Sequence, residues 1–136
     1  MELAMSFKEI EHFVSKKYNL RIVLERVNDN EVICHFKSIG FLGSLSKIRL
    51  AIDREYDGVD ALRVRFTGNL ISNLVIPNLL KRLSANLQEA IEVEDGGYAI
   101  LRLNGIPQLK SLLELFSLNY LSFTKSAARI EFSQVL

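Results

Sequence analysis

The sequence has little of several features that define common classes of protein. It contains one cysteine, two prolines and no tryptophan in 136 residues, and its formal net charge is only +1. A single cysteine cannot close a disulfide within the chain or build a cysteine-rich zinc site. The near balance of 17 basic and 16 acidic residues argues against a nucleic-acid binder, and a hydrophobic fraction of 49% excludes an intrinsically disordered chain.

Targeting and membrane-spanning segments are also missing from the pattern. Residues 1–6 hold no basic region followed by an apolar core, so we expect no signal peptide. The longest apolar stretch, residues 70–83, is interrupted by Asn73, Pro77 and Asn78 and is shorter than the roughly 20 residues that a spanning helix needs. We therefore predict a cytoplasmic protein.

Catalytic signatures are absent as well. The sequence has no phosphate-binding glycine loop, no nucleophile elbow and no His-Glu-x-x-His zinc motif. His12 and His35 have no readable partner, and we interpret both as structural. Four acids surround one predicted turn without the spacing of a calcium loop, which favours a solvated turn: Asp53, Glu55, Asp57 and Asp60. We expect no enzyme, no cofactor and no metal; an enzyme using His35 or the acidic turn is the third interpretation, behind two kinds of binding protein.

What the sequence does contain is a clear alternation of helical and strand periodicities. Ser6 and Glu9 have capping-box spacing at the start of a helix, and Asn19 is a stop signal for it. Apolar residues then alternate with polar ones at residues 20–25, 32–37, 47–53 and 62–67, with short connections. Cys34 lies in the second of these strands, and we predict that it is a small buried hydrophobe.

The second half of the chain repeats the two patterns. A predicted helix in residues 70–87 is apolar on most of its circumference, and Pro107 opens a shorter helix that reaches Phe116. Strands are predicted at residues 91–94, 98–103, 119–124 and 129–135. The predicted order is αββββαββαββ. We predict one α+β domain over residues 1–136, with an antiparallel meander sheet curved around or packed on a long apolar helix.

The polar face of the meander is basic. Its strands carry Lys37, Lys47, Arg49, Arg63 and Arg65 on one side. If the hairpin turn is centred near Asp57, Arg49 lies close to Arg65, and such like charges need a neighbouring acid or an anionic ligand. Two interpretations stay open. Either Asp53 and Glu31 compensate a solvated face, or Arg49, Arg63 and Arg65 bind an anionic group such as a lipid headgroup, a phosphate or an acidic protein surface.

Four short runs also resemble a known family. They are IPNLL at 76–80, YAILRL at 98–103, IPQL at 106–109 and ARIEF at 128–132. Together with the order of elements, they resemble the tubular lipid-binding domains of the BPI-like type, over about residues 20–136. The resemblance implies a curved antiparallel sheet wrapped around a long helix, with lipid held in the apolar groove between them.

Two segments, the loop at residues 39–45 and the helix at 70–87, hold apolar residues that strand or helix periodicity does not explain. Our first hypothesis is a non-enzymatic module that binds an apolar or lipid-like ligand between helix and sheet. The predicted lining residues are Phe41, Leu42, Leu50, Val64, Phe66, Leu74, Leu79 and Leu83, with Phe41 and Leu42 as a lid. The alternative is a protein-interaction or assembly module, a homodimer or heteromer that uses the same apolar surface.

Overall fold

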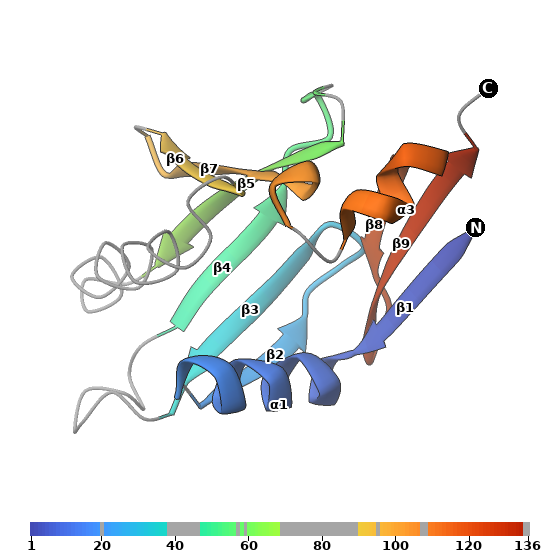
Figure 1. The fold of residues 1–136 in the computed structure, drawn as a ribbon. Helices are drawn as coiled ribbons and strands as arrows, with labels where there is room; N and C mark the ends of the chain where they lie inside the picture. The colour runs from blue at the N-terminus through green and yellow to red at the C-terminus, as the bar shows by residue number, and fades with distance from the viewer. Residues whose placement is uncertain are drawn as a thin grey trace.

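Two antiparallel sheets make up most of the described part of the chain (Figure 1). The computed structural model describes residues 1–19, 21–37, 47–56, 58, 60–68, 90–94, 96–106 and 109–134. One sheet has three strands in the order β1-β9-β8, and the other has six in the order β2-β3-β4-β5-β7-β6. Strands account for 56% of the described residues.

The chain begins with a strand that leads directly into a helix. β1 spans Glu2–Ser6 and α1 spans Phe7–Tyr18. Ser6 closes the predicted capping box: its hydroxyl accepts the Glu9 N–H at 3.0 Å, and the Glu9 carboxylate accepts the Ser6 N–H at 3.3 Å. Asn19 ends the helix in the left-handed conformation, with φ 55°. The predicted boundaries of this helix are confirmed.

The six-stranded sheet follows the predicted strands closely. Its strands are β2 (Ile22–Arg26), β3 (Glu31–Phe36), β4 (Lys47–Ile52), β5 (Ala61–Gly68), β6 (Ile91–Glu94) and β7 (Tyr98–Arg102). Gly96 and Gly97 both have φ +85° in the turn between β6 and β7, a conformation that glycine adopts without steric cost. The hairpin predicted there is confirmed.

One face of the six-stranded sheet carries the main core cluster. Cys34 lies opposite Leu24 on β2 and Ile48 on β4, so the alternating apolar residues of neighbouring strands share this face. The buried members are Cys34, Phe36 and Ile48, with Ile22, Leu24, Leu50 and Phe66 packed against them. The period of two that identified the strands also selected this face.

The three-stranded sheet joins the two ends of the chain. After the short 3-10 helix η2 (Leu103–Gly105) and α3 (Lys110–Leu115), β8 (Phe116–Phe123) and β9 (Ala127–Gln134) form a hairpin. β1 pairs with β9, so Leu3 lies opposite Ile130, which in turn lies opposite Leu121 on β8. Leu3, Ile130 and Leu121 therefore share one apolar face of this sheet.

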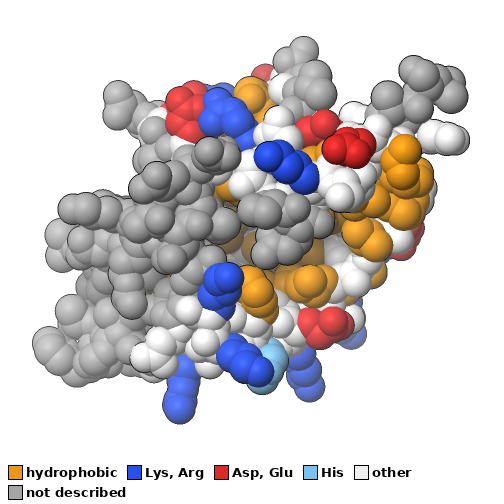
Figure 2. Space-filling model, viewed as in Figure 1, with side chains coloured by type: hydrophobic (Ala, Val, Ile, Leu, Met, Phe, Trp, Pro, Cys, Tyr) orange, Lys and Arg blue, Asp and Glu red, His pale blue; other side chains and the backbone are white. Residues whose placement is uncertain are grey.

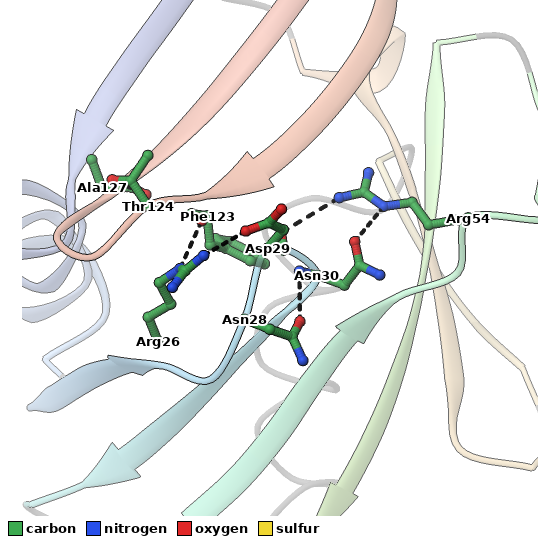
Figure 3. A network of polar contacts seen from close by, with 8 residues as sticks. All are labelled: Arg26, Asn28, Asp29, Asn30, Arg54, Phe123, Thr124 and Ala127. Carbon is green, nitrogen blue, oxygen red and sulfur yellow. Dashed lines mark hydrogen bonds and ion pairs between the residues drawn. The ribbon is translucent and has the colours of Figure 1, made fainter.

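The outer edge of β8 binds to turns of the six-stranded sheet, and we call this contact the seam. The Leu118 N–H donates to the Asp60 carboxylate at 2.8 Å. Further along, the Phe123 N–H donates to the Asp29 carbonyl at 3.0 Å, and the Phe123 carbonyl accepts from Arg26 Nε at 2.9 Å (Figure 3). The seam uses backbone groups of β8 that would otherwise face solvent at a free sheet edge.

Arg54 reinforces the seam between these two points. Its guanidinium lies 4.0 Å from the centre of the Tyr120 ring on β8. Its Nε donates to the Asn30 side-chain oxygen at 2.6 Å, and its Nη2 donates to the Asp29 carbonyl at 3.4 Å (Figure 3). One side chain of the β4–β5 turn therefore links the β2–β3 turn to β8.

The predicted architecture is wrong in two respects. The element order does not begin with a helix, because β1 precedes α1 and completes a second sheet. An antiparallel sheet packed on a long apolar helix is also contradicted: the described residues are mainly sheet, with one helix of 12 residues and a second of six. The predicted helix at 70–87 lies outside the described residues. The helix predicted from Pro107 to Phe116 shortens to α3, because Phe116 begins β8.

The seam yields a stability prediction. We expect Arg54→Ala to lower the free energy of unfolding by about 1 kcal/mol, because an exposed cation–aromatic contact and its accompanying hydrogen bonds are lost. In a double-mutant cycle with Tyr120→Leu, measured by urea denaturation, we expect a coupling of about 0.5–1 kcal/mol. Arg65→Ala is the control, since no ion pair joins it to a described residue, and should change stability by less than about 0.5 kcal/mol. Additive effects of the two seam substitutions would contradict this role.

Candidate functional site

Three of the eight predicted lining residues lie together on the apolar face of the six-stranded sheet. Leu50 on β4 is opposite Phe66 on β5, and Val64 is the next residue along β5 on that face. All three are half-buried, and Leu50 and Phe66 pack against the core cluster. The other five lie outside the described residues: Phe41, Leu42, Leu74, Leu79 and Leu83.

The predicted approach of Arg49 to Arg65 is displaced by two residues. In the observed register Arg49 lies opposite Thr67, and Arg65 lies opposite Ala51. The two arginines are therefore diagonal neighbours on the same face, a separation at which their repulsion is weaker than in a direct pair. The cause is the β4–β5 turn, which is centred one residue later than Asp57.

Arg63 is engaged by acids of its own sheet. Its guanidinium contacts the Asp53 carboxylate at 2.9 Å and the Glu94 carboxylate at 2.8 Å, and it lies 3.8 Å from the centre of the Tyr98 ring. The hydrogen bond to Glu94, and after it that to Asp53, raises the pKa of Arg63. These contacts tie β5 to the end of β4 and to β6, so Arg63 has a structural role.

Cross-strand ion pairs continue over the rest of this polar face. The described ion pairs are Glu31–Arg49 at 3.6 Å and Glu92–Arg102, and a His35–Glu25 side-chain contact at 3.1 Å lies on the same face. Compensation of the basic face by Asp53 and Glu31 is therefore confirmed. Binding of an anionic group by Arg49, Arg63 and Arg65 stays a prediction, with Arg65 the residue of the three that has no ion pair to a described residue.

Two acids of the predicted acidic turn, Asp53 and Asp60, make structural contacts. Asp53 binds Arg63 and accepts the Glu55 N–H at 3.1 Å. Asp60, at φ 51°, accepts the Leu118 N–H of the seam. Asp57 lies outside the described residues, and within the described part of the chain no three His, Cys, Asp or Glu side chains gather as a metal site would require.

A cleft of about 480 Å³ follows the seam between the β4–β5 turn and β8. Its lining includes Asn30, Arg54, Tyr56, Asn119 and Tyr120. Two polar residues of this lining contact each other, because the Arg54 Nε donates to the side-chain oxygen of Asn30, and the Arg54 guanidinium also lies over the Tyr120 ring. Since these contacts join residues on the two sides of the cleft, we interpret the cleft as the junction of the two sheets.

The exposed apolar side chains of β1 form a surface that periodicity-based analysis missed. Met1, Leu3 and Met5 share one face of the strand and are 50%, 44% and 49% exposed. Figure 2 shows apolar side chains gathered on the side of the molecule where β1, β9 and the end of α3 lie. A strand period is present in the sequence, because large apolar residues stand at every second position of residues 1–6. The capping box that follows favoured a helix as the first element instead.

The backbone of β1 is open on its outer edge. Met1 and Phe132 exchange two hydrogen bonds, at 3.0 and 2.7 Å, so the odd-numbered residues of β1 point their N–H and C=O groups to β9. By alternation the N–H and C=O groups of Glu2 and Ala4 point outward. Figure 1 shows α1 turning away from β1 toward β2, with no described element beside this edge. We call this edge, with the side chains of Met1, Leu3 and Met5, the β1 surface.

Two other sheet edges in the described part of the molecule are covered. The seam covers the outer edge of β8. On the edge strand β2, the Leu24 N–H donates to the Glu11 carboxylate of α1 at 2.9 Å. Among the described residues, side chains and turns therefore bind backbone groups at Leu118 and Phe123 of β8 and at Leu24 of β2, whereas none binds the outward groups of Glu2 and Ala4, which makes the β1 surface the candidate site.

Comparison with known proteins identifies no relative. No protein-family model, no curated protein and no solved structure matches the chain. Among the described residues, no helix is long and apolar enough to cross a membrane.

The environment of Cys34 leads to a prediction about thiol reactivity. Burial, and after it the charge of Glu11, raises the pKa of the Cys34 thiol from 9.0 to about 12. We expect a thiol-specific reagent to label the folded protein only as fast as it unfolds, and to label one thiol per chain in concentrated urea. Because the folded pKa is the higher one, the thiol's contribution to stability is complete below about pH 9 and falls as the pH rises toward 12. Rapid labelling of the folded protein at neutral pH would contradict this environment.

Proposed function

We propose that this chain is a non-enzymatic protein-interaction module that binds its partner through the β1 surface. The observation that carries the proposal is the contrast between edges: β8 and β2 have outward backbone groups bound at Leu118, Phe123 and Leu24, whereas the outward groups of Glu2 and Ala4 on β1 have no partner among the described residues. An edge strand with free hydrogen-bonding groups and exposed apolar side chains is a template for strand addition by another chain.

The composition of β1 supports the same proposal. Proteins that keep a sheet edge from pairing commonly place lysine, proline or an inward-pointing charge on it. The strand Glu2–Ser6 has none of these on its apolar face. Its one charged residue, Glu2, is bound by Arg129 of β9, with Nε to Oε1 at 2.9 Å. The edge therefore presents apolar contact and backbone pairing with little electrostatic opposition.

A pair of matched substitutions tests this function in the cells that produce the protein. Leu3→Lys and Val23→Lys each place a lysine on an edge strand, at positions that are 44% and 42% exposed. We expect the wild-type chain and Val23→Lys to migrate in a complex larger than the 15.5 kDa chain, and Leu3→Lys to bind its partner at least about tenfold more weakly. Cross-linking the tagged proteins in the cells before size-exclusion chromatography retains a weak complex and measures the difference. Identical migration of all three would contradict the proposal, provided their circular dichroism spectra agree.

A second candidate function is the binding of an apolar or lipid-like ligand. The observation in its favour is that Leu50, Val64 and Phe66 lie side by side on one sheet face and are only half-buried. Burial of a ligand's apolar surface there would contribute about 25 cal/mol per Å².

Native mass spectrometry of gently purified protein tests the second candidate. We expect a species heavier than 15.5 kDa by the mass of a ligand, together with saturable binding of a fluorescent fatty acid. Phe66→Ala should weaken that binding several-fold. Phe132→Ala, a truncation on the other sheet, should lower stability and leave binding unchanged. A single unliganded mass and no fatty-acid binding would reject this candidate.

A further inference from the structure

The β1 surface has a geometry that fits a copy of itself. We infer that the occupant of the β1 edge is β1 of a second copy of this chain, paired antiparallel about a two-fold axis that passes between the two Leu3 residues. The inference rests on the proposed function and names its partner. Four observations carry it: the direction of the backbone groups, the register that they favour, the charges on the strand and the side chains that this register brings together.

The backbone groups of β1 determine where the two-fold axis lies. Leu3 directs its N–H and C=O to β9, so across the outer edge it forms a non-hydrogen-bonded pair with Leu3 of the second copy. Glu2 then lies opposite Ala4 of the second copy on one side of the axis, and the same pair repeats on the other side. Each of these pairs exchanges two hydrogen bonds, so all the outward groups of Glu2 and Ala4 are satisfied.

The neighbouring symmetric register is less favourable. A two-fold axis at Ala4 would place Glu2 opposite Ser6 of the second copy and would require the outward Ser6 N–H as a donor. That N–H already donates to the Glu9 carboxylate in the capping box of α1. Pairing about Ala4 would therefore compete with the start of the helix, whereas pairing about Leu3 leaves it intact.

The side chains brought together are compatible on both faces. On the apolar face, Leu3 meets Leu3 and Met1 meets Met5 of the second copy, which extends the row of exposed apolar side chains into a continuous strip. On the other face, Glu2 meets the small side chain of Ala4 and keeps its ion pair with Arg129. No two like charges lie directly opposite each other in this register. The formal net charge of +1 adds little long-range repulsion between copies.

The resulting assembly is a closed dimer. The two three-stranded sheets become one six-stranded sheet, and each copy uses its β1 edge once, so the symmetric contact does not propagate into a fibre. Pairing of five-residue strands buries less surface than the roughly 1,200 Å² of stable interfaces. We therefore expect a weak dimer that forms at high protein concentration.

Cysteine cross-linking tests the two-fold axis directly. Leu3→Cys places two thiols in a non-hydrogen-bonded pair, where the Cα atoms are about 4.5 Å apart and a disulfide can close. Met5→Cys places the thiols roughly 14 Å apart along the strand, because Met5 faces Met1 of the second copy. Cys34 is 6% exposed and does not interfere. Under mild oxidation we expect Leu3→Cys to form a covalent dimer at least about tenfold faster than Met5→Cys or the matched control Val23→Cys. Equal rates for the three would overturn the inference.

Sedimentation of purified protein separates this inference from the proposed function. The Ala4 N–H points away from β9, so Ala4→Pro removes two intermolecular donors per dimer and leaves the β1–β9 hydrogen bonds in place. We expect the wild-type chain to dimerise at millimolar concentration and Ala4→Pro to weaken the dimer about tenfold. A wild-type chain that stays monomeric at that concentration overturns the second copy as the occupant. If Leu3→Lys still reduces the size of the cellular complex, the proposed function stands with a different partner; if neither effect is seen, both fail.

Discussion

The structure depends on how the outer edge of β8 is held. A three-stranded sheet has little core of its own, and β8 carries a row of backbone groups that nothing within its sheet can satisfy. Asp60, Asp29 and Arg26 of the six-stranded sheet supply those partners, and Arg54 adds a contact to Tyr120 between them. The two sheets are thereby joined through polar contacts at turns (Figure 3). Such contacts are directional, so they define where one sheet lies relative to the other as well as holding them together.

The seam also determines which edge remains for a partner. Because outward groups of β8 are bound by turns and the Leu24 N–H on β2 by Glu11 of α1, β1 offers an open edge on the opposite side of the small sheet. The polar face of the six-stranded sheet points to the same conclusion. Its arginines at positions 49, 63 and 102 are paired with acids across neighbouring strands. Those arginines are engaged within the sheet, whereas β1 offers both backbone pairing and apolar contact.

Local patterns were sufficient for most of the secondary structure. The capping box at Ser6 and Glu9, the turn glycines at 96 and 97 and the alternation around Cys34 each involve residues near one another in sequence, so their physical causes are visible there. The register of β4 against β5 was predicted two residues off, because it depends on the conformation of the connecting turn. β1 was missed for a different reason: a five-residue alternation has no meaning until β9, more than 120 residues later, supplies its partner.

The sequence by itself determined α1, the strands of the six-stranded sheet, the apolar face of those strands, and the presence of acids near the basic face. Those properties follow from hydrogen bonds and periodicities that operate within a few residues. Only the tertiary structure decided that the strands divide into two sheets, and that turns and α1 bind outward groups of β8 and β2 while no described residue binds those of Glu2 and Ala4 on β1. Edge exposure is a relation between segments far apart in the chain, and the contacts that set it, such as Arg26 with Phe123 and Leu118 with Asp60, join residues 97 and 58 positions apart.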